Sequence, residues 1–104
     1  MYCKVKNGYA EIGDIVTRID FYGESGVDPH NLYKVTEFDE YQGIKQVRFR
    51  RLKKGTLEFL TANGQLAGGD MMSFDEATFN LRIIEKAEKT PTFWSKLIKM
   101  FQNK

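Results

Sequence analysis

The stretch that decides the fold is residues 32–52, LYKVTEFDEYQGIKQVRFRRL. Apolar and polar residues alternate on both sides of a central turn, Y-Q-G. After the turn, Val47 and Phe49 fall on one face, and Arg48 and Arg50 fall on the other. This alternation has the period of a half-buried β-strand. The stretch therefore predicts two antiparallel strands joined by a tight turn.

The first of these strands, residues 32–39, has two predicted faces: Tyr33, Val35 and Glu37 on one, and Lys34, Thr36 and Phe38 on the other. The second strand is predicted over residues 44–52. Further segments rich in β-branched and aromatic residues span residues 2–6, 14–21, 56–61 and 79–84. Such residues favour strands. Five or six short antiparallel strands predict a small barrel, because closure removes exposed strand edges.

Two connections between these strands have patterns of their own. Residues 63–70 are rich in glycine and predict a mobile loop. Ser73 is followed three residues later by Glu76, which is the pattern of a capping box. It predicts a capped single helical turn over residues 73–77.

The end of the chain has a different pattern. Thr90 and Pro91 are suited to the cap and the first position of a helix. Apolar side chains then recur at spacings of three and four, which predicts a short amphipathic helix. The chain is therefore expected to divide into a β-domain over residues 1–86 and a linker with a C-terminal amphipathic helix over residues 87–104.

Length and composition bound the class of protein. A chain of 104 residues, 41% of them hydrophobic, has room for one domain with a modest core. The only cysteine is Cys3, so no internal disulfide can form and a reducing, cytoplasmic setting is expected. The first residues lack the apolar region of a signal peptide, and no run reaches the ~18 apolar residues of an integral membrane segment.

Charge is distributed unevenly along the chain. Residues 1–40 carry four basic and eight acidic side chains, whereas residues 41–62 carry six basic and one acidic. Such asymmetry can mark an interaction face. It can equally mean that acidic and basic strands lie side by side and neutralise each other. The sequence leaves both readings open.

The order of motifs resembles the small SH3-like barrels. The segments that carry the resemblance are residues 13–16 (GDIV), 32–35 (LYKV), 47–50 (VRFR) and 74–84. The resemblance covers roughly residues 10–85 and implies a small antiparallel SH3-like barrel. Many such barrels are encoded by bacteriophages and mobile elements. The single Trp, Trp94, lies in the tail and not in the paired-aromatic groove that peptide-binding SH3 domains present.

The sequence offers little for catalysis. His30 and Cys3 are its only histidine and cysteine, and they are expected to be an exposed loop residue and a buried small hydrophobe. A nucleophile, a base and an orienting acid cannot be assembled from them. The chain contains no phosphate-binding loop, dinucleotide fingerprint or metal-ligand spacing. We therefore expect no enzyme activity and no cofactor.

A basic run is the candidate nucleic-acid site. Its members are Lys45, Arg48, Arg50, Arg51, Lys53 and Lys54. Arginines on a strand with aromatic neighbours are typical of small barrels that follow a phosphate backbone. Phe49, however, is expected to point inward, which leaves this face without a stacking platform. The alternative is a solvated strand paired with acidic neighbours such as Glu37 and Glu58.

The tail helix is the candidate partner-binding site. Its apolar stripe is Phe93, Trp94, Leu97, Ile98 and Phe101. The stripe can fold back onto the barrel, dock in a groove of another protein, or lie on an anionic membrane surface. The membrane reading is disfavoured by the short length and the few lysines.

These patterns favour a non-catalytic protein-binding module, of the kind that a phage or mobile element uses to modulate or inhibit a host protein. The partner is then another protein, expected to be bacterial. The alternative is a nucleic-acid-binding small barrel that uses the basic run. The sequence gives neither the partner's identity nor the oligomeric state.

A truncation after Lys89 tests where the apolar stripe lies. We expect the free energy of unfolding to fall by a few kcal/mol, because each large side chain that is buried contributes ~1.5–3 kcal/mol before entropy costs. Thermal or urea denaturation of both forms measures the change. An unchanged melt with lost binding would place the stripe on a partner. A truncated form that becomes monomeric where the full chain is not would place it in a self-association interface.

Overall fold

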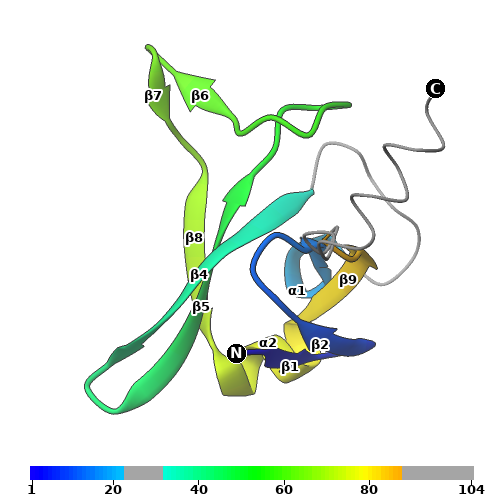
Figure 1. Ribbon diagram of the computed structural model, residues 1–104, viewed down its shortest axis with the longest axis vertical. Coiled ribbons are helices and arrows are strands. Elements are labelled where there is room, and N and C mark those ends of the chain that lie inside the picture. Colours follow the sequence, from blue (N-terminus) through cyan, green and yellow to red (C-terminus); the bar gives the residue numbers. More distant parts are fainter. Residues whose placement is uncertain (23–31, 88–104) are drawn as a thin grey trace, which may run out of the picture.

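The computed structural model describes residues 1–22 and 32–87, so the predicted helix, the stripe at residues 93–101 and His30 lie outside the described residues. The protein is mainly β, as predicted, and its centre is an antiparallel sheet with the strand order β8-β5-β4-β3-β9 (Figure 1). The strands are β3 (Ile15–Arg18), β4 (Tyr33–Tyr41), β5 (Ile44–Arg51), β8 (Gly69–Ser73) and β9 (Leu81–Glu85).

The hairpin of β4 and β5 forms where the sequence predicts it. Gln42 and Gly43 make the turn with φ of 51° and 79°. This left-handed backbone is what a two-residue turn between twisted strands requires. Val47 and Phe49 of β5 are fully buried, so the predicted inner face of this strand is confirmed.

A β-bulge changes the faces of β4 from those predicted. Thr36 is an extra residue between the pairs that Val35 and Glu37 make with β5. Its hydroxyl donates to the Arg48 carbonyl at 3.3 Å. Because a bulge shifts the alternation by one residue, Phe38 packs against the core and Glu37 is exposed. The predicted grouping of Glu37 with Val35 is therefore wrong.

The core lies on the inner face of the sheet. The rings of Tyr33 and Phe49 meet edge-on with centroids 5.2 Å apart, and those of Phe38 and Phe74 meet in the same way at 5.6 Å. Edge-to-face rings at this distance are a favoured arrangement. The buried cluster consists of Cys3, Val5, Ala10, Val16, Tyr33, Val35, Val47, Phe49, Met72, Ala77 and Leu81.

Helix α2 (Phe74–Asn80) connects β8 to β9. The Ser73 hydroxyl accepts the Glu76 N–H at 3.1 Å, so the predicted cap is confirmed. The helix has seven residues and is longer than the single turn predicted. It buries Ala77 against the core, which fixes the connection between the two strands.

Two of the predicted strands have different structures. Strand β3 ends at Arg18, and the short helix α1 (Ile19–Tyr22) replaces the rest of the strand predicted over residues 14–21. The strand predicted over residues 56–61 does not form as one element, because Phe59 makes a single bridge with Leu52 and Thr61 belongs to a separate two-residue strand. Both segments have suitable composition, but neither has a continuous neighbouring strand that would satisfy its backbone.

The glycine-rich segment contains a hairpin and not only a loop. Strands β6 (Thr61–Ala62) and β7 (Gln65–Leu66) pair across a turn made by Asn63 and Gly64, whose φ values are 54° and 77°. An Asn-Gly pair is the strongest short-range signal for such a turn. The sequence therefore contained this hairpin, and the prediction of a mobile loop over residues 63–70 missed it.

The predicted closed barrel is wrong, because β8 and β9 do not pair and the sheet stays open. The free edge of β9 is covered by the N-terminal hairpin of β1 (Cys3–Val5) and β2 (Gly8–Ala10). In the turn of this hairpin, Asn7 accepts the Ile83 N–H at 2.8 Å and donates to the Ile83 carbonyl at 2.9 Å. The Asn7 amide thus satisfies the N–H and the carbonyl of Ile83, which would otherwise be open to pairing with another strand.

Side chains also satisfy the backbone of β8 and connect this strand to β3. Asp70 accepts the Met71 N–H at 2.8 Å and also pairs with Arg18. Arg18 belongs to β3, which is not a neighbour of β8 in the sheet. The same guanidinium contacts Asp20 at 2.6 Å. An ion pair therefore connects two strands that are not hydrogen-bonded neighbours in the sheet.

Among the described residues, none of the helices has the length and apolar character needed to cross a bilayer.

Candidate functional site

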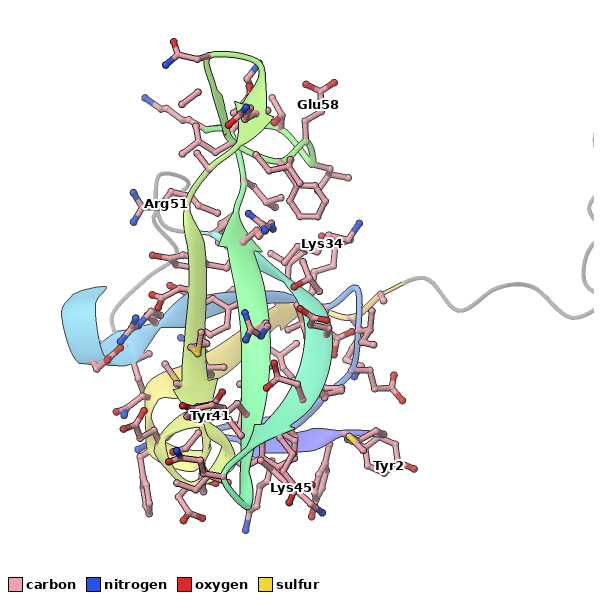
Figure 2. The ribbon with its side chains drawn as sticks, turned by 90° about the vertical axis from the view of Figure 1, so that its left-hand side faces the viewer. Tyr2, Lys34, Tyr41, Lys45, Arg51 and Glu58 are labelled. Atoms are coloured by element: carbon pink, nitrogen blue, oxygen red, sulfur yellow. The ribbon has the colours of Figure 1, made fainter. Side chains whose placement is uncertain are left out.

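The basic run is spread over several surfaces. Lys45 and Arg51 lie at opposite ends of β5 (Figure 2), and Lys53 and Lys54 follow in an exposed turn. Arg51 donates to the Tyr33 hydroxyl at 2.9 Å and lies 5.4 Å from the centre of its ring. The six basic residues of the run therefore do not line one continuous face.

The two arginines on the outer face differ in their surroundings. Arg48 pairs with Asp39 and lies 3.6 Å from Glu37. The hydrogen bond that Arg48 donates to the Asp39 carboxylate raises the pKa of Arg48. The Arg50 side chain makes no hydrogen bond or ion pair with any residue in the described ranges, and Arg50 is opposite Lys34 in the ladder. Pairing of the run with acidic neighbours is confirmed for Glu37 and extends to Asp39.

Cys3 is a core residue. Its side chain is fully buried on β1, and this burial raises the pKa of the thiol to about 11. A thiol with a raised pKa is protonated at neutral pH and is a poor nucleophile. The predicted role of Cys3 as a buried small hydrophobe is confirmed. Within residues 1–22 and 32–87, side chains of His, Cys, Asp and Glu form no group of three that could hold a metal.

The described residues form a surface hollow that the sequence did not predict. It is a shallow groove of about 710 Å³ on the side of the N-terminal hairpin, and we call it the tyrosine groove. Tyr2 and Tyr9 are 61% and 60% exposed, and their rings meet edge-on with centroids 6.1 Å apart. The groove is lined by Tyr2, Asn7, Gly8, Tyr9, Glu11, Ile83 and Lys86.

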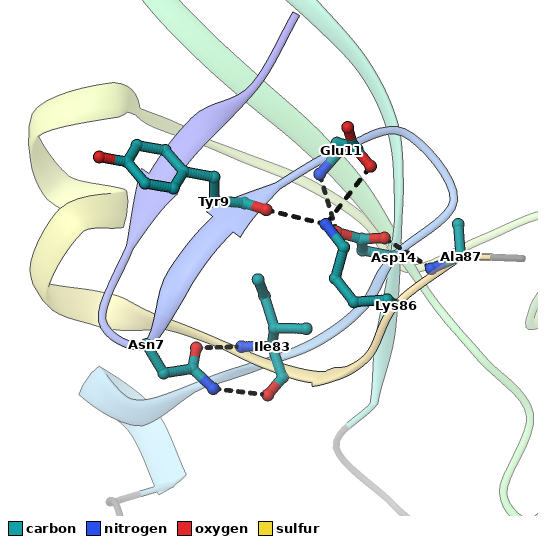
Figure 3. A network of polar contacts seen from close by, with 7 residues as sticks. All are labelled: Asn7, Tyr9, Glu11, Asp14, Ile83, Lys86 and Ala87. Atoms are coloured by element: carbon teal, nitrogen blue, oxygen red, sulfur yellow. Dashed lines mark hydrogen bonds and ion pairs between the residues drawn. The ribbon is translucent and has the colours of Figure 1, made fainter. Parts of the chain in front are cut away.

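The groove is assembled from the two ends of the described chain. Tyr9 lies on β2, where it is opposite Lys4, and Tyr2 comes directly before β1 of the same hairpin. Ile83 comes from β9 and is held against this hairpin by the two hydrogen bonds of Asn7 (Figure 3). An alternating pattern around the Asn7-Gly8 turn was the available signal, but the docking of β9 beside it depends on the fold.

A buried carboxylate holds one side of the groove in place. Asp14 has no exposed surface, and its two oxygens accept the N–H groups of Glu11 at 2.8 Å and Ala87 at 2.7 Å (Figure 3). The Lys86 ammonium donates to Asp14 at 2.6 Å and to the Tyr9 carbonyl at 2.9 Å, and it lies 3.4 Å from the Glu11 carboxylate.

These contacts set the protonation states. Burial alone would raise the pKa of Asp14, but the hydrogen bonds from Ala87, Lys86 and Glu11 outweigh it and hold this pKa below its ordinary value. Burial alone would lower the pKa of Lys86, and its pairing with Asp14 and Glu11 raises it instead. Both groups are therefore charged at neutral pH, and their charges compensate one another. The rim of the groove carries no isolated charge at this point.

The chain matches no family model, no curated protein and no solved structure.

We expect Asp14→Asn to lower the free energy of unfolding by about 2 kcal/mol at pH 7, because Asp14 is fully buried and the amide cannot accept both backbone N–H groups that its two oxygens accept. The pKa of Asp14 is depressed in the folded state, so its contribution is present above the unfolded pKa near 3.8 and is lost as the pH falls through the lower folded pKa. The difference between the two proteins should therefore shrink below about pH 4.

Urea denaturation at several pH values measures this difference. Glu40→Gln is the matched control, because the Glu40 side chain is exposed on β4 and makes no hydrogen bond or ion pair with the described residues. Equal destabilisation by Asp14→Asn at pH 3 and pH 7 would contradict a role for the charged carboxylate.

Proposed function

We propose that this chain is a non-catalytic protein-binding module that contacts its partner through the tyrosine groove. The single observation that carries the proposal is the pair of exposed tyrosines at one open hollow. Tyrosine combines a large apolar ring with a hydroxyl that water or a partner can satisfy. It is enriched among the residues that dominate binding energy at protein interfaces.

The chemistry of the groove favours an apolar partner segment. Ile83 forms its apolar side, and at its rim the Lys86 ammonium lies between the carboxylates of Glu11 and the buried Asp14, so each charge has an opposite charge beside it. An apolar side chain placed between Tyr2 and Tyr9 would bury ring surface without stranding a charge. We propose that the partner presents such a side chain on an exposed segment and that it is a bacterial host protein, which a phage or mobile-element factor would modulate.

The SH3-like part of the fold prediction is also a proposal. In its support, the last described strand, β9, returns to pair with the opening strand β3, and α2 leads directly into it. The sheet would then be an opened form of the small barrel that the sequence resembles. Its gap is the region that the N-terminal hairpin and the Arg18–Asp70 pair occupy.

Capture from a nuclease-treated bacterial lysate, followed by titration with the purified captured protein, tests the protein-binding proposal. We expect Tyr2→Ala and Tyr9→Ala each to weaken the Kd at least about tenfold, since a residue that dominates an interface contributes ~2 kcal/mol or more. Tyr41→Ala is the matched control, because this tyrosine is 64% exposed at the tip of the β4–β5 hairpin. Equal loss in Tyr41→Ala, or no loss in the groove variants, would overturn the proposal.

Nucleic-acid binding remains the second candidate, and Arg50 is the observation that favours it. The guanidinium of Arg50 has no partner among the described residues, and Arg50 is opposite a second basic residue, Lys34, in the β4–β5 ladder. If this surface binds phosphates, a gel shift with DNA or RNA at ~50 mM salt should be abolished by Arg50→Glu and weakened as salt rises. Capture that is lost on nuclease treatment would favour this candidate over the tyrosine groove.

A further inference from the structure

A second hollow lies beside the point where the described chain ends. It has a volume of about 390 Å³ and is separate from the tyrosine groove, although Lys86 borders both. Its apolar walls come from three parts of the chain and are Ile12, Ile15, Leu57 and Ala87, with Lys34 and Glu85 at the rim. We call it the Ile12–Leu57 groove.

The walls of this groove are costly to leave in water. Ile12 is 57% exposed and Leu57 is 72% exposed. Neither side chain has a polar atom that water could satisfy, unlike the hydroxyls of Tyr2 and Tyr9. Two aliphatic side chains that face one hollow form an apolar patch that a covering segment would stabilise.

We propose that residues 93–101 of the same chain cover the Ile12–Leu57 groove. Ala87 is both a wall of the groove and the last described residue. Phe93 follows six residues later, a span of at most about 20 Å when extended. A tether this short gives the segment a high effective concentration at the groove, which a second copy or a free partner would lack.

The chemistry of the segment complements that of the groove. Phe93, Trp94 and Leu97 supply apolar side chains at helical spacing, and residues 90–104 contain three lysines and no acidic residue. At the rim, the Glu85 carboxylate makes no hydrogen bond or ion pair with the described residues. A lysine beside the apolar stripe can therefore pair with Glu85 while the stripe covers Leu57.

The fluorescence of Trp94 in the full chain tests this assignment, because Trp94 is the only tryptophan. Wild type should emit at short wavelength and resist quenching by acrylamide. Ile12→Ser and Leu57→Ser should each shift the emission to longer wavelength and increase quenching. Leu66→Ser is the matched control, because Leu66 is a leucine that is 55% exposed on β7 and outside the groove, and it should change neither. Far-UV circular dichroism checks that each variant is folded.

Each alternative occupant gives a different result. A solvent-like Trp94 spectrum in the wild type would overturn the proposal outright. A shift caused by Tyr9→Ser but not by Leu57→Ser would place the segment in the tyrosine groove instead. A spectrum that changes over a roughly hundredfold range of protein concentration would show that a second copy supplies the segment. If Ile12→Ser does not fold, Leu57→Ser decides alone, because its side chain is the more exposed of the two.

Discussion

The buried carboxylate of Asp14 is the contact on which the arrangement of this protein most depends. It accepts hydrogen bonds from the turn that precedes β3 and from the chain that leaves β9, and it pairs with Lys86. A buried charge is tolerated only when such partners compensate its lost hydration. The N-terminal part of the domain and the end of β9 must therefore come together for either to be stable. Both grooves lie beside this junction.

Gly13 allows the turn before β3 to lie close to Ala87 at this junction. Its φ of +95° is a conformation that other residues rarely adopt, and a Cβ there would lie 3.0 Å from the Cβ of Ala87. The Gly13 N–H donates to the Val35 carbonyl at 2.8 Å, which ties the same turn to β4. Gly13 thus supplies the backbone conformation of the turn, and the adjacent Asp14 supplies the buried carboxylate that the turn places beside Ala87.

The edges of the open sheet are protected, so exposed side chains are more accessible to another molecule than the strand edges are. The Asn7 side chain hydrogen-bonds the N–H and the carbonyl of Ile83 on β9. The Asp70 carboxylate accepts the Met71 N–H on β8. Addition of another strand at these positions would have to displace a side chain that is already hydrogen-bonded. Another molecule can therefore contact the side chains that line the grooves more readily than the edges of β8 and β9. The hydroxyls of the tyrosine groove are compatible with the reversible partner that we propose, whereas the aliphatic walls of the Ile12–Leu57 groove are compatible with the tethered cover that we propose.

The sequence by itself determined the local elements whose signals lie within a few residues. Alternation fixed the β4–β5 hairpin, and Ser73 with Glu76 fixed the start of α2. Tertiary structure decided the rest. The bulge at Thr36, the end of β3 at Arg18 and the open edge of the sheet depend on which neighbour satisfies each backbone group, and those neighbours are distant in sequence. The tyrosine groove had no sequence signal as a whole, because it joins residues about 75 positions apart through contacts such as that between Asn7 and Ile83.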